Sequence, residues 1–446
     1  MALSPQDRDL LRRLYRDTDP NKPIDPTKPG SEFYQPIYEG PGVEDPVKLL
    51  EAKIDFAETE GMFLLSGFRG SGKTTELLRL KQRLEAAGHL VLYADALQYV
   101  HPAQPVDITD LLISIAGALG DAIEERGGFG DPLHEGYWTR FEHFLRETKV
   151  EIPETGASGG GFSVKVSLRG NDSFRTRVRD ALATRVQELE NQVRKFAEDC
   201  VKAIRKRHPE GKVVFIFDQL EQIRGSLSGE KEVIQSIERL FANHIRRLEL
   251  PYIHVVYTVP PWLKFVLAGT PVDVLHNVRQ WNNDPQRTRF EHGCQSLLEV
   301  VQKRFGPDGM ARFWANDAQP MRIIDSCGGH FKDLLKLLQE TIARAAAAAE
   351  LPVSDRVVDA ALIAVRNSFL PIAYEDAIWL KNVFDSRRCA LPSTGSEDVA
   401  HLTRLIDTHL ILYLKNGEEW YDVHPLIRDD VIEMAAKPID VPNGRH

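Results

Sequence analysis

Short apolar runs alternate with longer helical patterns along much of the chain. The apolar runs occupy residues 62–65, 90–95, 213–218 and 251–259. Runs of this length with few polar positions are typical of parallel strands that are buried on both faces. The segments that follow the first and third runs carry apolar residues at helical spacing. The pattern therefore predicts an α/β fold with a parallel sheet.

A long insertion separates the second and third predicted strands. Residues 107–126 and 137–148 each have one apolar face at helical spacing, and residues 172–208 form one long helical pattern. Two interpretations of the long pattern remain open, packing against helices of its own domain and an intermolecular coiled coil. Because sustained heptads are missing, the pattern favours packing within the domain.

The middle of the insertion has a different pattern. Residues 155–161 are rich in glycine, and apolar residues then occupy alternate positions. Such alternation is typical of a strand with one buried face, so we expect a hairpin at about 149–169. The alternating residues are Phe162, Val164, Val166 and Leu168.

The two ends of the chain have their own patterns. Residues 5–16 predict a short helix, and the proline-rich segment 19–46 predicts an extended arm. Near the C-terminus, residues 397–409 predict a helix, and residues 410–423 predict a hairpin that turns at Asn416-Gly417. A last helix is expected to begin at His424-Pro425-Leu426.

The first apolar run leads into a glycine-rich loop. Gly67 is followed by four residues and then by Gly72-Lys73-Thr74, the spacing of a P-loop. Glycines let the backbone N–H groups turn toward a polyphosphate, Lys73 can reach the β- and γ-phosphates, and the Thr74 hydroxyl can bind Mg²⁺. We therefore expect ATP and Mg²⁺ as cofactors. The expected nucleotide contacts in this segment are Gly67, Phe68, Arg69, Gly70, Ser71, Gly72, Lys73, Thr74 and Thr75.

A carboxylate ends the third apolar run. Asp218 has the position of a Walker B residue, which predicts a Mg²⁺ ligand. Gln219 stands where a catalytic glutamate commonly follows, so Glu221 becomes the candidate to orient the attacking water, with a structural ion pair as the alternative. Thr258, near the end of the fourth run, either contacts the γ-phosphate or water or is simply a strand-forming residue.

Composition narrows the functional classes. The 446 residues carry a formal net charge of -9, so the chain as a whole lacks the basic character of nucleic-acid binding proteins. The four cysteines are far apart and form neither a zinc motif nor a disulfide framework. Neither a leader peptide nor an apolar run of membrane-spanning length is found in the sequence, which predicts a cytoplasmic protein with no membrane partner.

The loop, Asp218 with Glu221, and Tyr257-Thr258 together resemble the AAA+ and STAND branch of P-loop ATPases. Residues 326–335 resemble the start of the sensor 2 helix in origin-recognition-type ATPases, which implies that Lys332 contacts the nucleotide. An arginine is usual at that position, and lysine keeps the charge but loses the bidentate fork.

Two further segments carry the resemblance. Residues 397–426 resemble a winged helix, and residues 67–77 resemble bacterial ATPases of mobile-element and antiphage loci. The expected fold class is therefore α/β, a P-loop NTPase parallel sheet (AAA+-like) with a helical lid and a C-terminal winged-helix domain.

The resemblance implies four parts. An arm at 1–45 precedes a P-loop ATPase core at 46–290, which contains the helix and hairpin insertion at about 101–208. A helical lid at 291–368 and a winged-helix-like domain at 369–446 follow. The arm at 34–47 either lies against the nucleotide base or covers the edge of the sheet.

Three functions remain open. The first is an ATP-hydrolysing AAA+/STAND-like switch that couples nucleotide state to self-assembly and to an effector protein, in an antiphage setting. The second is a DNA-acting initiator or transposition ATPase, with DNA less favoured as a partner because acidic residues dominate the predicted wing and the helix before it. The third is an ATP-binding scaffold that hydrolyses slowly, in keeping with Gln219.

Hydrolysis in the family usually needs an arginine from a neighbouring subunit, so the resemblance also implies a homo-oligomer. The candidates lie before or after the fourth apolar run. They are Arg246, Arg247, Arg279, Arg287 and Arg289.

Overall fold

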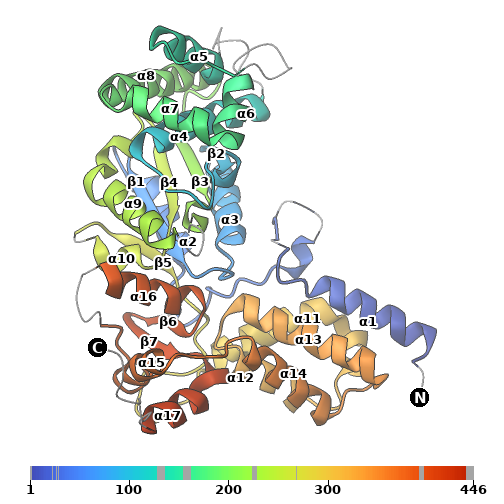
Figure 1. Ribbon diagram of the computed structural model, residues 1–446. Coiled ribbons are helices and arrows are strands. Elements are labelled where there is room, and N and C mark those ends of the chain that lie inside the picture. Colours follow the sequence, from blue (N-terminus) through green and yellow to red (C-terminus); the bar gives the residue numbers. More distant parts are fainter. Residues whose placement is uncertain are drawn as a thin grey trace, which may run out of the picture. The chain divides into compact units, whose positions relative to one another are not determined.

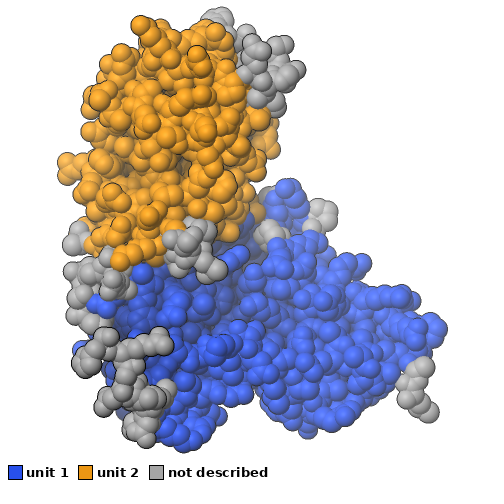
Figure 2. All heavy atoms as spheres, viewed as in Figure 1, with its two compact units in different colours: residues 1–46, 67–75, 275–446 blue, residues 47–66, 76–274 orange. Residues whose placement is uncertain are grey.

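The computed structural model describes residues 3–22, 24–26, 28, 30–127, 136–153, 162–223, 229–267, 269–390 and 396–437. Their contacts divide the chain into two compact units, coloured separately in Figure 2. Unit 1 comprises residues 1–46, 67–75 and 275–446, and unit 2 comprises residues 47–66 and 76–274. The glycine-rich loop thus groups with the arm and the C-terminal part of the chain.

A five-stranded sheet is the centre of unit 2. Its strands are β1 (Met62–Gly67), β2 (Leu90–Asp95), β3 (Val213–Asp218), β4 (His254–Val259) and β5 (Val272–Leu275), in the order β2-β3-β4-β1-β5. The pairs β2–β3, β3–β4 and β4–β1 are parallel. Every residue of β3 and β4 is buried, as their apolar runs predicted. The expected α/β class with a P-loop NTPase sheet is confirmed.

Outside the insertion, three helices of more than one turn lie next to the sheet strands along the described chain. They are α2 (Pro46–Phe56), α3 (Lys73–Ala86) and α9 (Glu230–Asn243). Helix α2 was not predicted, because the proline-rich pattern of the arm continues through Pro46. Proline is tolerated in the first turn of a helix, where its missing N–H has no partner to lose. Pro46 therefore begins the helix.

The insertion is a group of five helices, drawn mainly in green in Figure 1. They are α4 (Ile108–Arg126), α5 (Tyr137–Glu147), α6 (Phe162–Gly170), α7 (Asp172–Leu182) and α8 (Val186–Arg205). Helix α4 packs on the edge strand β2 and on α8. The long helical pattern at 172–208 therefore packs within its own domain, as favoured, although it is broken into α7 and α8 at residues 183–185.

The predicted strand at 162–168 is wrong, because this segment is helix α6. Val164 and Ser167, one helical turn apart, are buried, whereas Val166 is 42% exposed. The helix contacts α5 and α7, so burial follows helical rather than alternating spacing. A seven-residue run fits both periods, and the helical neighbours decide between them. The glycine-rich tip at 155–161 lies outside the described residues.

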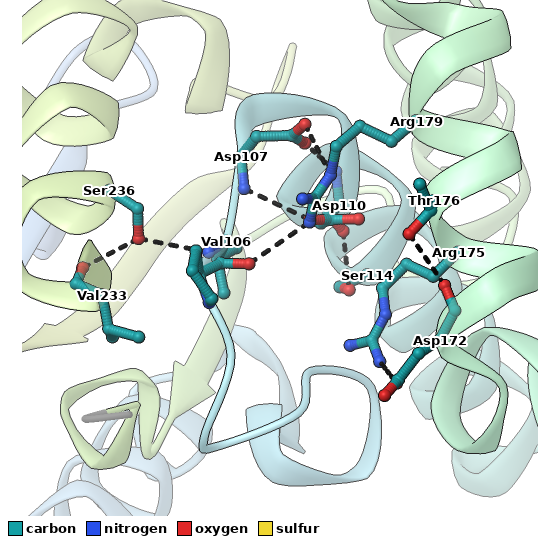
Figure 3. A network of polar contacts seen from close by, with 11 residues as sticks. Val106, Asp107, Asp110, Ser114, Asp172, Arg175, Thr176, Arg179, Val233 and Ser236 are labelled. Carbon is teal, nitrogen blue, oxygen red and sulfur yellow. Dashed lines mark hydrogen bonds and ion pairs between the residues drawn. The ribbon is translucent and has the colours of Figure 1, made fainter. Parts of the chain in front are cut away.

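An ion-pair network fixes the start of the insertion (Figure 3). Arg179 of α7 reaches both Asp107 and Asp110 at the beginning of α4. Asp107 and Asp110 also form a reciprocal capping box. Val106 N donates to Ser236 Oγ of α9 at 3.2 Å. These contacts join the start of α4 to α7 and to α9.

Unit 1 begins with α1 (Pro5–Asp17), as predicted, which packs on two helices of the lid region. The lid region comprises α11 (Glu291–Phe313), α12 (Ala318–Ser326), α13 (Phe331–Ala348) and α14 (Asp355–Asn367). Gly306 has a φ of 66° and interrupts α11 just before Pro307. Helices make up most of this region.

The C-terminal part has the predicted winged-helix order. It contains α15 (Tyr374–Ser386), α16 (Ser396–Asp407), β6 (Ile411–Asn416), β7 (Glu418–Val423) and α17 (Arg428–Ala436). The antiparallel hairpin β6–β7 turns at Gly417, whose φ is 88°, so the turn was correctly predicted. None of the helices in the described ranges is long and apolar enough to cross a membrane.

The remaining helical turns are short. They are α10 (Leu263–Val266) and the 3₁₀ turns η1 (Ser31–Phe33), η2 (Ala96–Gln98), η3 (Leu220–Gln222), η4 (Ile245–Leu248) and η5 (Pro425–Ile427).

Candidate nucleotide-binding site

The loop after β1 adopts a conformation that its glycines allow. Gly70 and Gly72 have φ values of 86° and 89°, which L-residues rarely adopt. The Ser71 N–H donates to Phe68 O at 3.1 Å and closes the turn. A Cβ atom at Gly72 would meet nothing within 4 Å, so the loop is open on that side.

Lys73 is the first residue of α3 and is buried. Its Nζ donates to the carbonyl oxygens of Gly67 at 2.7 Å and Phe68 at 3.1 Å, so the ammonium lies inside the loop. Thr74 and Thr75 follow in the same first turn, where helical N–H groups have no intrahelical acceptor. Ser71 Oγ is buried and has no hydrogen-bond partner among the described residues. Cation, N–H groups and hydroxyl together fit a polyphosphate.

Two segments of unit 1 that are distant in sequence hold the loop. The arm contributes Ile24, whose N–H donates to Thr75 Oγ1 at 3.2 Å. His330 Nε2 lies 3.0 Å from Arg69 O, and because a carbonyl can only accept, this nitrogen is the donor. The Lys332 N–H donates to Gly70 O at 3.2 Å.

The expected sensor residue thus lies against the loop. A Cβ added to Gly70 would be 2.5 Å from Lys332 Cβ, so the lysine stem packs directly on this glycine. Burial, together with the nearby Arg69 guanidinium, lowers the pKa of Lys332. Arg69 itself is exposed. Contact of either side chain with a nucleotide stays a prediction.

In unit 2, Asp218 ends β3 and is fully buried. Its Oδ2 accepts from Tyr93 Oη at 2.8 Å, and its Oδ1 accepts from Gln219 N at 2.7 Å. Burial and the adjacent Asp218 carboxylate raise the pKa of Tyr93, so the phenol keeps the proton that it donates. The carboxylate is therefore held in one orientation, and its oxygen chemistry suits Mg²⁺.

Glu221 lies in the short turn η3 directly after Asp218 and is mostly buried. Gln219, with a φ of 72°, turns the chain into η3. The Leu220 N–H in this turn donates to Thr258 Oγ1 of β4 at 3.1 Å. Thr258 therefore holds the turn that carries Glu221, and its predicted contact with the γ-phosphate or water stays a prediction.

The register of the sheet brings the strand ends to one edge. Asp95 lies opposite Asp218, and Ser66 lies opposite Val259. Ser66 and Asp218 therefore both lie at the carboxyl ends of parallel strands of this sheet. Open parallel sheets bind ligands at the carboxyl ends of their strands.

Three contributors were missed by the sequence analysis. Tyr93 lies in a correctly predicted strand, but its contact with Asp218 depends on the register between strands. His330 lies within the quoted segment 326–335, where only Lys332 was given a role. Ile24 acts through its backbone N–H, which leaves no signal in a side-chain pattern.

No protein-family model matches the chain, and neither does any curated protein sequence. Among solved structures, it is similar to the ORC2 protein of Aeropyrum pernix in ADPNP–ADP complexes, with 12% identity, a TM-score of 0.37, and coverage of 87% of this chain and 92% of that chain. A Walker-type ATPase of Pyrococcus abyssi gives 12% identity, a TM-score of 0.37, and coverage of 88% and 95%. Drosophila ORC bound to DNA gives 12%, 0.37, and coverage of 98% and 94%. At such low similarity, the fold assignment rests on the strand order and the loop.

Proposed function

We propose that this protein binds and hydrolyses ATP with Mg²⁺ and acts as an AAA+/STAND-like switch, coupling nucleotide state to self-assembly and to a partner or effector protein. The observation that carries the proposal is the loop 67–75, in which the buried Lys73 ammonium, at the start of α3, lies inside the loop and donates to two of its backbone carbonyls. The proposed setting in a mobile-element or antiphage locus rests on the loop sequence alone.

Each polar group has a distinct role in this proposal. Lys73 and the loop N–H groups bind the β- and γ-phosphates, while Thr74 and Asp218 bind Mg²⁺. Glu221 orients the attacking water as a general base. The hydrogen bonds to Asp218 and to η3 support these assignments, because they fix the two carboxylate-bearing segments before any ligand is bound.

The proposal is tested at Lys73. Lys73→Ala should abolish ATP binding in isothermal titration calorimetry, because the loop loses its buried cation. Lys81→Ala is the matched control, since Lys81 lies on the same helix and only forms an i,i+4 ion pair with Glu85 at 3.1 Å. Micromolar affinity retained by Lys73→Ala would refute the phosphate-binding role of the loop.

Among the arginines considered for action in trans, four are already engaged. Arg247 pairs with Glu190, Arg287 with Asp422 and Arg289 with Asp325, while Arg279 donates to Gly42 O. Arg246 in η4 is exposed, and the structure gives it no ion pair within the described ranges. We therefore assign Arg246 as the residue donated to a neighbouring subunit.

This assembly model predicts that ATPase activity per molecule rises with protein concentration, since an arginine finger is worth roughly 10³–10⁵ in rate. Arg246→Ala should flatten the rise, whereas Arg239→Ala, an exposed arginine on α9, should keep it. A flat profile for the unsubstituted protein, with a constant monomer mass in light scattering, would exclude action in trans.

Action on DNA is the alternative function, and the wing gives it little electrostatic support. Glu418 and Glu419 are exposed, and Lys415 pairs with Glu44 at 2.6 Å. Duplex binding should therefore be weak and lost by physiological salt in a fluorescence anisotropy titration. Salt-resistant, sequence-dependent binding would instead favour an initiator.

A further inference from the structure

Four buried side chains meet in unit 1 where α13 begins. His330 precedes α13, Asp333 lies in its first turn, His409 follows α16, and His424 follows β7; their exposed fractions are 0–6%. The three histidines surround one carboxylate oxygen of Asp333. Asp333 Oδ2 lies 2.7 Å from His330 Nδ1, 3.1 Å from His409 Nδ1 and 3.7 Å from His424 Nε2.

Hydrogen bonds leave this cluster incompletely satisfied. His409 Nε2 and His424 Nε2 are buried, and neither has a hydrogen-bond partner in the described part of the chain, whereas His330 Nδ1 is in ion-pair contact with Asp333 Oδ2. Buried polar atoms without partners are uncommon in native proteins, and a bound ion is one of their recognised explanations. Two such nitrogens beside a buried carboxylate, in a group of residues whose donor atoms lie close together, point to a cation.

The hydrogen bond made by the second nitrogen of each imidazole ring shows which histidines can bind a metal ion. His330 donates Nε2–H to Arg69 O, so Nδ1, which faces Asp333 Oδ2, is the nitrogen that a metal ion would bind in place of a proton. Metal-binding histidines usually donate their second N–H to a carbonyl or carboxylate in this way. His424 differs, because its Nδ1 accepts from Leu426 N at 3.3 Å. Its Nε2 therefore carries the proton and is a donor, not a ligand.

The two carboxylate oxygens of Asp333 have different neighbours. Lys336 Nζ binds Asp333 Oδ1 at 3.1 Å, which leaves Oδ2 to the histidines. One donor atom each from His330, Asp333 and His409 can be chosen so that all lie within 4.8 Å of one another. Two imidazoles and one carboxylate form a donor set that suits Zn²⁺ better than Mg²⁺, which prefers oxygen ligands.

We propose that His330, Asp333 and His409 form a binding site for a divalent transition-metal ion of the zinc class, with His424 Nε2 beside it, 3.7 Å from Asp333 Oδ2. The site is separate from the Mg²⁺ position of the nucleotide site and does not depend on ATP hydrolysis. It would join the start of the lid helix α13 to the residue before the wing. Through His330 it would also fix the Arg69 carbonyl of the phosphate-binding loop.

The first test needs no substitution. The full chain, without a histidine tag, is stripped with a chelator, exchanged into chelator-free buffer and titrated with Zn²⁺ against a chromophoric competitor. One equivalent per chain should bind, and Co²⁺ in its place should give the visible absorption bands of a bound ion. Less than about a tenth of an equivalent at micromolar Zn²⁺, with no cobalt spectrum, would overturn the proposal.

The second test separates ligands from neighbours. Because losing a partner of a ligand typically weakens metal binding by about 10–100-fold, His424→Gln should fall in that range and His409→Ala beyond it. His143→Ala, at an exposed histidine on α5, is the control and should bind as the unsubstituted chain does. Unchanged zinc affinity in a folded His409→Ala protein would overturn the assignment, and the cobalt spectrum of the unsubstituted chain decides if that variant does not fold.

Discussion

Gly70 and Gly72 offer a matched pair of substitutions in the phosphate-binding loop. Both have a positive φ, so alanine at either position should cost about 1–2 kcal/mol in backbone strain. At Gly72 the new Cβ enters open space, whereas at Gly70 it would lie 2.5 Å from Lys332 Cβ and 2.7 Å from Lys332 Cδ. Gly70→Ala must therefore also move the loop away from α13.

The additional cost follows from the contacts that would have to change. Ordinary carbon contacts are about 3.5–4.0 Å, so the loop must shift by roughly 1 Å, and overpacking of this kind costs about 1–3 kcal/mol. The shift also strains the hydrogen bond from Lys332 N to Gly70 O, worth about 0.5–1.5 kcal/mol. We expect a loss of about 2.5–6.5 kcal/mol for Gly70→Ala and about 1–2 kcal/mol for Gly72→Ala.

Urea denaturation of the nucleotide-free protein, followed by tryptophan fluorescence, measures both losses in the free energy of unfolding. Four of the six tryptophans, Trp281, Trp314, Trp379 and Trp420, lie in unit 1 with the loop, so the signal reports on the relevant unit. Lys332→Gly should relieve the clash, giving a coupling of at least about 1 kcal/mol with Gly70→Ala. Equal losses for the two alanine variants, or no coupling, would refute docking of the loop on α13.

Three further outcomes are expected. Glu221→Gln should slow ATP hydrolysis by about 10²–10⁴ with binding intact, while Asp218→Asn should instead raise the Mg²⁺ requirement; identical phenotypes would contradict the separate roles. Tyr93→Phe removes a charge-assisted hydrogen bond worth about 1.5–3 kcal/mol, so half-saturating Mg²⁺ should rise about tenfold or more, without a change in ATP affinity measured in EDTA. Burial lowers the pKa of His254 to about 4, so on acidification the unfolded chain binds a proton that the folded chain does not. The free energy of unfolding should therefore fall by about 1–2 kcal/mol from pH 7 to pH 5, measured by thermal unfolding. His254→Asn, whose side chain can still accept from Gly61 N, should reduce this pH dependence.

The parts of the fold that sequence predicted well are those with one dominant physical signal. The run ending at Asp218 is apolar throughout, so burial on both faces leaves no competing interpretation, and β3 has the predicted bounds. β5 has four residues, three of them half-buried, and carries no such signal. The segment that forms α6 fitted two periods, and tertiary packing against α5 and α7 selected the helix.

The candidate site was predictable to a similar extent. The loop and Asp218 are local motifs, so their spacing was visible in the sequence. The residues that support them were not, because their contacts are set by register and long-range docking. Tyr93 reaches Asp218 across the pairing of β2 with β3, and His330 reaches Arg69 across 261 positions of the chain.

The loop carbonyls divide into two groups with different partners, which suggests how nucleotide state reaches the rest of unit 1. Gly67 O and Phe68 O bind the ammonium of Lys73, for which phosphate oxygens compete. Arg69 O accepts from the His330 ring, and Gly70 O accepts from the Lys332 N–H. The charge of a phosphate would not displace either donor from its carbonyl. Under the proposed function, nucleotide binding would change the contacts of Gly67 O and Phe68 O and leave those of Arg69 O and Gly70 O in place. The contacts of that second half with His330 and Lys332, and those of Asp333 with His330 and His409, connect the loop to α13 and to the residue before the wing.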